Sequence, residues 1–539
     1  MKQVWFKSYE KGVPSHLDYP AITLSGMLHQ TTSRFPKQNA LIYLEHQWTY
    51  QEVDNLVSQM ANLLISYGVK PGDRVGIQLP NSPQFVISYF GILRAGAISV
   101  PINPSFSGDE LIYIIQDSGM QILITNLEMV PVLTDSSFNH LKIITTDIRV
   151  PFSAENDYNL SINGTKLEKV LFGQPVSDPK IEVTPESVAN LQYTGGTTGL
   201  YKGAMLTHRN LIANATQLRA WFKNVYNDGE GRFICVIPMF HIYAMSTNLN
   251  HAILSGSSQI LMSKFDLNEL IRLIEKHKPN IFMGVPAMYG AIAMRDNANN
   301  YDLSSIEACI CGSAPLPPVV HQRFEKLTGG KLREGYGLSE CSPVVAVTPI
   351  NGQFKYGSVG IPFPDTEVKI VNPETGEELK EFGAVGEIVV KGPQVMLGYW
   401  GHPKETALVL KDSWLHTGDL GSIDEDGYIF ITDRLKDMII VGGEKVYPRE
   451  IEDLLYSHPA VKEAAVIGAP HSLRGEVPEA YVVLKETAAT SEKELRRFCS
   501  EHLSKFKVPH KIQVVEELPR SSVGKVLRRL IRDKYYGDK

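Results

Sequence analysis

Apolar, strand-like runs alternate with amphipathic helical stretches over most of this 539-residue sequence, and no other feature constrains its fold as much. Residues 74–80 read RVGIQLP, residues 82–96 have the spacing of a helix, and residues 97–103 again resemble a strand. The helical pattern of residues 266–280 likewise runs straight into the apolar stretch 281–286. Such alternation predicts βαβ units and a mainly parallel sheet.

The residue composition and the secondary-structure pattern of the sequence change twice toward its C-terminal end. From about Gly357, glycines, prolines and short β-rich pieces indicate a small β subdomain. After Asp433, helical and strand-like segments follow one another over about 100 residues, a normal domain size. We therefore expect an α/β protein. Its large N-terminal domain (residues 1–433) would contain stacked αβ subdomains plus the small β subdomain, hinged to a small α+β C-terminal domain (residues 434–539).

Composition narrows the class of protein. Hydrophobic residues make up 43% of the chain, and 53 basic residues are nearly balanced by 59 acidic ones, which argues against a nucleic-acid-binding stripe. We see no secretory signal and no apolar run of the ~18 residues that a spanning helix needs, so we predict a cytoplasmic location. The cysteines have no CxxC spacing and are expected to be free thiols in a reducing compartment; they are Cys235, Cys309, Cys311, Cys341 and Cys499.

Residues 193–203 read YTGGTTGLYKG and have the composition of a phosphate-binding loop. Glycines expose backbone N–H groups, threonines add hydroxyl donors and Lys202 adds a positive charge, which together suit a polyphosphate. The spacing does not match a Walker loop, because Gly203 follows Lys202 where Ser or Thr is required. A flexible glycine-rich turn is the alternative. We expect a strand before the loop and a helix that begins with AMLTHRNLIANATQ after it.

The loop occurs with five further motifs: GYGLSE (335–340), WLHTGD (414–419), DRLKDMI (433–439), GGEKVYPREIE (442–452) and PRSSVGKVLR (519–528). In this order they resemble the adenylate-forming superfamily, which includes acyl-CoA synthetases, peptide-synthetase adenylation domains and beetle luciferases. The likeness is greatest to bacterial long-chain fatty-acid–CoA ligases. This resemblance implies a two-step activation of an acid to acyl-AMP and then acyl-CoA, with ATP, Mg²⁺ and coenzyme A.

The resemblance also implies roles for individual residues. Lys525 would bridge the acyl carboxylate and the α-phosphate, Glu340 would hold Mg²⁺ against the phosphates, and Ser339 would offer a hydroxyl near the α-phosphate. The implied ATP- and AMP-binding residues are Thr194, Gly195, Gly196, Thr197, Thr198, Gly199, Lys202, Tyr336, Asp419 and Arg434. Among them, Tyr336 would pack on adenine and Asp419 would accept hydrogen bonds from the ribose hydroxyls, with Arg434 on the same ribose or on phosphate.

For the second step, the resemblance implies rotation of the C-terminal domain about Lys436. The residues brought in for coenzyme A would be Gly442, Gly443 and Glu444, and Arg474 and Lys505 are candidates for its nucleotide phosphates. We interpret Arg528 and Arg529 as ordinary members of a charged helix that begins near Val526.

The acyl pocket implied by the resemblance contains His241, Met245, Gly284, Gly312 and Gly337. No Asp lies near His241 to pair with an ammonium group, which argues against an amino acid substrate. Met245 stands where some relatives carry a tryptophan gate, and a flexible methionine suits an adaptable apolar tunnel. We therefore predict a medium- or long-chain fatty acid.

Four alternatives stay open at this stage. They are a ligase for an aryl or short-chain acid of the coumarate kind, an acyl-AMP ligase that loads a carrier protein, an ATP-binding module without catalysis, and a light-emitting oxygenase. The expected partners are the small-molecule substrates and not nucleic acid. Peripheral membrane contact and a homodimer are also left open.

Overall fold

The structure is a computed structural model that describes residues 3–106, 108–134, 138–149, 152, 164–195, 201–485, 488, 490–521 and 525–537. The chain clusters into two compact units. The large unit comprises residues 2–367 and 390–415, and the small unit comprises residues 368–389 and 416–539. The predicted mixed α/β class is confirmed, whereas the predicted boundary between residues 433 and 434 stays a prediction.

One sheet of the large unit has seven strands in the order β7-β6-β5-β3-β4-β8-β9. All its neighbours pair in parallel except β8 and β9, which are antiparallel. The predicted βαβ unit is present, because helix α3 (Pro83–Arg94) connects the parallel strands β3 and β4. The strand bounds are Arg74–Gln78 (β3), Ile98–Pro101 (β4), Ile122–Asn126 (β5), Lys142–Thr146 (β6), Thr165–Lys166 (β7), Val188–Gly195 (β8) and Tyr201–Thr207 (β9).

The second sheet of the large unit has nine strands in the order β16-β15-β14-β13-β12-β10-β11-β1-β2. Its central strands are parallel, and antiparallel pairs close both edges. The bounds are Asn39–Tyr43 (β1), His46–Thr49 (β2), Arg232–Cys235 (β10), Ser258–Leu261 (β11), Ile281–Gly284 (β12), Ala308–Cys311 (β13), Lys331–Gly337 (β14), Val344–Val347 (β15) and Ile361–Pro362 (β16). A short pair, β19 (Leu410–Lys411) with the start of β20, lies outside both sheets.

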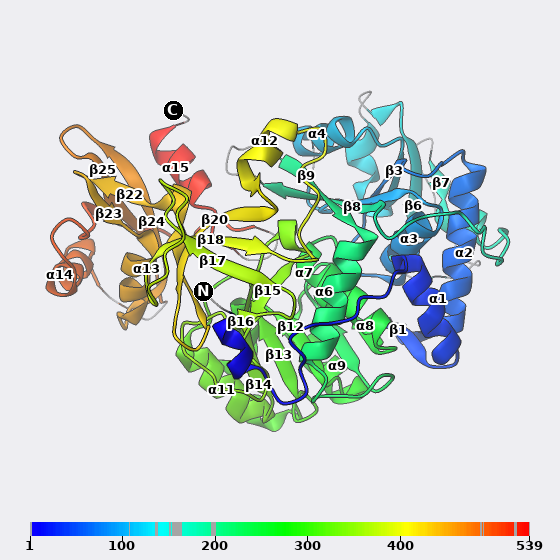
Figure 1. Cartoon of the computed structure of the whole chain (residues 1–539), viewed down its shortest axis with the longest axis horizontal. Coiled ribbons are helices and arrows are strands. Elements are labelled where there is room, and N and C mark those ends of the chain that lie inside the picture. Colours follow the sequence, from blue (N-terminus) through cyan, green and yellow to red (C-terminus); the bar gives the residue numbers. More distant parts are fainter. Residues whose placement is uncertain are drawn as a thin grey trace. The chain divides into compact units, whose positions relative to one another are not determined.

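Helices cover these sheets, and α1 and α2 run side by side in Figure 1. Helix α3 is buried along its whole length, which explains why apolar residues occur on all its faces. Helix α9 instead has one apolar face. Its N-cap is Asp266, whose side chain accepts the Glu269 N–H. The helices of the large unit are Leu24–Arg34 (α1), Tyr50–Ser66 (α2), Pro83–Arg94 (α3), Gly108–Ser118 (α4), Leu167–Leu171 (α5), His208–Trp221 (α6), Ile242–Ala244 (α7), His251–Leu254 (α8), Leu267–His277 (α9), Pro286–Ala293 (α10), Pro318–Thr328 (α11) and Pro403–Val409 (α12).

The small unit contains two further sheets. In the first, β17, β18 and β20 are neighbours and β21 pairs with β20; in the second, the order is β23-β22-β25-β24, with β26 beside β25. The bounds are Glu367–Val371 (β17), Gly386–Lys391 (β18), Trp414–Ile423 (β20), Ile429–Arg434 (β21), Ile439–Val441 (β22), Glu444–Val446 (β23), Val461–His471 (β24), Gly475–Leu484 (β25) and Lys511–Val514 (β26). The helices are Pro448–Ser457 (α13), Glu492–His502 (α14) and Arg528–Tyr536 (α15).

Two expectations about the chain as a whole can be compared with the structure. All five cysteines are free and buried, as predicted. Among the described residues, no helix combines the length and apolar character required to cross a membrane.

Candidate active site

The predicted phosphate loop includes the end of strand β8 and the start of strand β9. Strands β8 and β9 are antiparallel, and Thr194 faces Lys202 just before the loop. The expectation that a helix begins with AMLTHRNLIANATQ is wrong for the first four residues, AMLT, which continue β9. Helix α6 starts only after Thr207, whose hydroxyl caps it by accepting the Asn210 N–H. Four predicted phosphate-binding residues, Gly196, Thr197, Thr198 and Gly199, lie outside the described residues, and Gly195 is described only in its backbone.

Glu340 has a neighbour that the sequence did not single out. It lies in a short 3-10 helix, Ser339–Cys341, directly after β14, and its Oε1 accepts a hydrogen bond of 2.7 Å from the Tyr399 hydroxyl. Burial and the negative charge of Glu340 raise the pKa of Tyr399 far above its ordinary value, so the phenol stays a donor. Lys202 Nζ lies 5.6 Å from the centre of the same ring. The structure thus brings Lys202, Glu340 and Tyr399 together in the large unit.

Tyr336 and Gly337 end strand β14, next to Ser339 and Glu340. Tyr336 is half-buried and pairs with Ala346 of β15. A Cβ atom on Gly337 would lie 2.3 Å from the Pro343 carbonyl oxygen, so only glycine fits this close backbone approach. Gly337 therefore has a structural reason to be glycine that is independent of any acyl chain.

Tyrosine rings cover two of the predicted acyl-pocket glycines. A Cβ on Gly284 would lie 2.7 Å from the Tyr289 ring, and one on Gly312 would lie 3.3 Å from the Tyr243 ring. Both hydroxyls donate to the Ile310 carbonyl, at 2.8 Å from Tyr243 and 2.9 Å from Tyr289. These contacts order the strand ends at which the pocket is predicted.

The remaining two predicted pocket residues belong to one continuous helical segment. His241 is half-buried and caps α7, its Nδ1 accepting the Tyr243 N–H at 3.2 Å. Met245 is completely buried and opens a π-helix, Met245–Asn250. π-Helical turns are rare in proteins, and those that occur often lie at functional sites.

In the small unit, two further predicted nucleotide-binding residues, Asp419 and Arg434, lie next to each other. They are opposite each other in the register of β20 and β21, with Arg434 Nε 3.3 Å from Asp419 Oδ1. Before Asp419, Gly418 has a φ of 69°, and its N–H donates to Glu387 Oε1 at 3.1 Å. The Thr417 hydroxyl donates to the Ile388 carbonyl and accepts the Asp419 N–H. The left-handed turn at Gly418 thus fixes the direction of the Asp419 carboxylate.

Lys525 is half-buried in the same unit, and its charge is perturbed. Burial lowers the pKa of its amine to about 7, and the charges of Arg434 and Arg528 act in the same direction, against Asp419 and Asp437. A lysine with a pKa near neutrality is typical of functional sites. Its backbone is held by Ser521, whose hydroxyl accepts the Lys525 N–H and whose own N–H donates to the Lys525 carbonyl.

The contacts of Arg528 contradict one interpretation of the sequence. It was expected to be an ordinary residue of a charged helix, yet its guanidinium contacts three carboxylates, those of Asp433, Asp437 and Glu452. The local sequence could not indicate these contacts, because the three partners lie 76 to 95 residues away. Arg529, by contrast, is mostly exposed, and its Nε lies 4.0 Å from Asp533 Oδ2.

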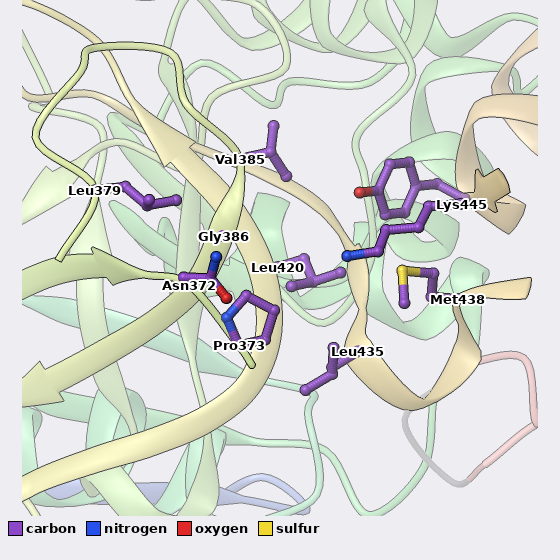
Figure 2. Close-up of a pocket in the computed structure, with 10 residues that line it drawn as sticks. Asn372, Pro373, Leu379, Val385, Gly386, Leu420, Leu435, Met438 and Lys445 are labelled. Atoms are coloured by element: carbon purple, nitrogen blue, oxygen red, sulfur yellow. The ribbon is translucent and has the colours of Figure 1, made fainter. Parts of the chain in front are cut away.

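The predicted hinge residue, Lys436, is exposed in a 3-10 turn, Leu435–Asp437, between β21 and β22. Leu435 and Met438, on either side of the hinge, line a cavity of about 100 Å³ (Figure 2). Tyr447 also lines this cavity, and Figure 2 shows Lys445 on the side of Met438, facing Gly386 of β18 and residues of the segment after β17.

The residues predicted for coenzyme A lie in a tight turn. Gly442 and Gly443 connect β22 to β23 with φ angles of 61° and 94°, and Glu444 follows them, exposed. A Cβ on either glycine would meet nothing within 4 Å, so the turn conformation rather than a narrow space requires glycine here. Arg474 and Lys505 are exposed, and the Arg474 carbonyl accepts the Gly442 N–H.

Comparison with known proteins explains why the candidate site residues lie in two separate units. The family model described as AMP-binding enzyme matches residues 28–400, and the model for the AMP-binding enzyme C-terminal domain matches residues 450–525. An enzyme that binds a nucleotide is built from two such parts, each with its own set of polar residues. The chain belongs to the AMP-binding enzyme family.

Relatives and solved structures extend over nearly the whole chain. A long-chain-fatty-acid–CoA ligase of Bacillus subtilis is 41% identical, covering 98% of each chain, and a 4-coumarate–CoA ligase of Vanilla planifolia is 35% identical over 95% of this chain and 93% of its own. The ATP-bound MatB structure from Rhodopseudomonas palustris has a TM-score of 0.86 at 29% identity, covering 96% of this chain and 99% of MatB. A Mycobacterium tuberculosis fatty acyl CoA synthetase has a TM-score of 0.75 at 28% identity, covering 95% and 98%.

Proposed function

We propose that this chain activates a medium- or long-chain fatty acid. The acid's carboxylate displaces pyrophosphate from ATP to give acyl-AMP, and the thiol of coenzyme A then displaces AMP to give acyl-CoA. The general class, an ATP-dependent, AMP-forming acid–thiol ligase, follows from the family and the relatives. The observation that carries the choice of acid is the 41% identity over 98% of both chains to a relative named for long-chain fatty acids.

The first step brings two anions together, so positioning and neutralisation of charge account for most of the catalysis. Lys525 is the proposed catalytic cation, placed between the acyl carboxylate and the α-phosphate. Asp419 accepts hydrogen bonds from the ribose hydroxyls and Arg434 contacts the ribose or a phosphate. Tyr336 packs on the adenine, and Ser339 donates to the α-phosphate. Thr194, Lys202 and the glycine-rich loop between them hold the β- and γ-phosphates.

The residues at Glu340 fit a magnesium ion that is carried by the substrate. Mg²⁺ is usually held by one or two carboxylates, substrate phosphates and water rather than by a cage of protein ligands. In the part of the chain that the structure describes, no group of three metal-ligating side chains occurs, and Glu340 offers a single carboxylate oriented by Tyr399. Bound there, Mg²⁺ would neutralise phosphate charge. Glu340 would hold the ion and Tyr399 would keep the carboxylate in place.

The second step needs a different face of the C-terminal domain. We place the boundary of that domain between residues 433 and 434 and the pivot at Lys436, where a few φ and ψ changes suffice for rotation. The exposed turn of Gly442, Gly443 and Glu444 is the face proposed to meet coenzyme A. A cytoplasmic location, peripheral membrane contact to collect a lipid acid, and a homodimer complete the proposal.

A panel of acids tests the choice of substrate. The full chain is incubated with ATP, Mg²⁺ and coenzyme A, and with acids from acetate through octanoate and palmitate to coumarate, and acyl-CoA is quantified. The proposal requires the highest kcat/KM between C8 and C18. A maximum on coumarate would assign the aryl-acid alternative, and formation of acyl-AMP without any acyl-CoA in the presence of coenzyme A would assign the enzyme that loads a carrier protein.

A further inference from the structure

We infer that Asp433 and Arg528 form a latch across the hinge, which keeps Lys525 beside Asp419 for the first step and opens before the second. We call this contact, with the Asp433–Arg449 hydrogen bond next to it, the Asp433–Arg528 latch. The inference rests on the proposed function, because it concerns the rotation about Lys436 that the two steps require. Both residues are proposed as positioning residues.

The contacts of Asp433 cross the hinge. Asp433 precedes Lys436, and its side chain is only 2% exposed. Its Oδ1 lies 3.4 Å from Arg528 Nη1, and its Oδ2 accepts the Arg449 N–H, at the start of α13, at 2.8 Å. Arg449 Nη1 in turn donates to the Ile431 carbonyl at 3.1 Å. A rotation about Lys436 would separate these partners, because Asp433 and Ile431 lie before the pivot and Arg449 and Arg528 lie after it.

The other contacts of Arg528 stay on its own side of the hinge. Two of its nitrogens bind the Glu452 carboxylate, at 3.0 and 2.6 Å, and Nη1 lies 3.0 Å from Asp437. Glu452 is itself fixed on α13, where its Oε1 accepts the Val466 N–H at 2.7 Å. Arg528 is therefore held by the C-terminal domain in every position of that domain.

This arrangement suits a contact that has to open and close. Removing one partner from an isolated buried ion pair is strongly unfavourable, because a charge is left without compensation. When Asp433 leaves Arg528, however, Glu452 and Asp437 continue to neutralise the guanidinium. The Asp433 carboxylate loses a helix N-terminal donor, Arg449, and a cation, so the closed arrangement is favoured without being permanent.

The latch is linked to Lys525 through the short stretch of residues 525–528. Arg528 follows Lys525 by three residues, and the Leu527 N–H donates to the Pro519 carbonyl at 2.8 Å. Ser521 and Lys525 exchange hydrogen bonds beside it. Because this segment is tied to itself, fixing Arg528 against Asp433 also fixes Lys525, whose amine feels the charge of Asp419 on the other side of the hinge.

A pair of matched variants tests the latch. Asp433→Asn and Asp437→Asn each remove one carboxylate charge from Arg528, but only Asp433 lies before the pivot. The first step is followed as palmitate-dependent exchange of pyrophosphate into ATP, and the second as consumption of synthetic palmitoyl-AMP by coenzyme A. We expect Asp433→Asn to slow the first step about 5- to 50-fold relative to the second. Asp437→Asn should leave the ratio of the two rates unchanged. Equal losses in both steps for Asp433→Asn, or the same change of ratio in both variants, would overturn the inference.

A measurement that needs no substrate separates the latch from the proposed activity. Cysteines introduced at the exposed Phe382, before the hinge, and Leu473, after it, can carry a donor and an acceptor dye, since the native cysteines are buried. Asp433→Asn should broaden the distribution of transfer efficiency in the free protein, and Asp437→Asn should not. Identical distributions in all three proteins would overturn the latch even in an active enzyme, while inactivity of the unmodified chain on every acid would count against the proposed function alone.

Discussion

Asp419 of β20 and Arg434 of β21 face each other, with 3.3 Å between Asp419 Oδ1 and Arg434 Nε, and Asp419 is buried. The same pair contributes opposite charges next to Lys525. One cross-strand pair thus connects the proposed ribose-binding carboxylate with the charge state of the proposed catalytic lysine.

Asp419→Asn should weaken ATP binding with little change in folding. The amide retains the shape of the side chain but loses the charge that strengthens hydrogen bonds to the ribose, which are worth about 1.5–3 kcal/mol when one partner is ionised. We expect the KM for ATP to rise about 10- to 100-fold with a smaller change in kcat. Steady-state kinetics at saturating acid measure this, and Asp424→Asn on the same sheet is the control. A KM for ATP within twofold of the original value would contradict the role of Asp419.

Lys525→Met should abolish the first step selectively and stabilise the fold. Loss of the cation should reduce adenylation about 10²- to 10³-fold, by analogy with other charge-stabilising groups, and leave the consumption of synthetic acyl-AMP nearly intact. The free protein holds Lys525 with a pKa of about 7, below the ordinary value of about 10.4. Between these pH values the unfolded chain binds more protons, so the stability of the original protein rises with pH over this window.

The stabilising effect of Lys525→Met therefore depends on pH in a defined direction. The variant should have the higher melting temperature at pH 7 and below, and the difference should shrink as the pH approaches 10. Thermal unfolding of both proteins across this range gives the difference directly. A difference that grows with pH would mean that Lys525 is not desolvated in the folded protein.

Tyr399→Phe should alter the dependence of activity on magnesium. The phenol donates to Glu340 at 2.7 Å, so its loss frees the carboxylate to adopt other rotamers without changing the charge at the site. We expect the Mg²⁺ concentration for half-maximal activity to rise about 3- to 10-fold, the effect of one hydrogen bond, and Glu340→Gln to raise it further. Tyr356→Phe, at an exposed tyrosine of the large unit, is the control. No shift with Tyr399→Phe would show that Glu340 is positioned by other contacts.

Tyr243→Ala should change which acids are accepted. The ring covers Gly312, and its hydroxyl binds the Ile310 carbonyl, so truncation opens space beside the predicted acyl pocket. We expect the preference to shift toward longer or bulkier acids, and we expect a loss of about 3–5 kcal/mol in stability if the site does not collapse, as for other buried aromatic residues. Competition between octanoate and palmitate measures the preference. Tyr289→Ala is a useful comparison, because its ring lies against Gly284 instead. An unchanged octanoate-to-palmitate ratio would place the acyl chain elsewhere.

The sequence predicted the architecture well because its signals were local. The strand–helix–strand alternation around α3 and the helical face of α9 depend on neighbours a few residues apart. The extension of β9 to Thr207 was missed, because AMLT reads equally well as the first turn of a helix until the pairing with β8 is known. The capping hydroxyl of Thr207 was the available signal for the true start of α6.

The functional residues that the sequence did not reveal depend on distant partners. Tyr399 lies 59 residues from Glu340, and Arg528 lies 95 residues from Asp433, so no spacing rule connects them. Lys525 could be identified only because its motif resembles that of a known family. Its lowered pKa comes from burial and from charges brought in by folding.

The most direct test of the account is the balance of products formed by the unmodified chain from palmitate, ATP, Mg²⁺ and coenzyme A. The account predicts equal amounts of palmitoyl-CoA, AMP and pyrophosphate, and enzyme-bound palmitoyl-AMP when coenzyme A is omitted. Formation of ADP and phosphate, or absence of palmitoyl-AMP when coenzyme A is withheld, would contradict the two-step mechanism.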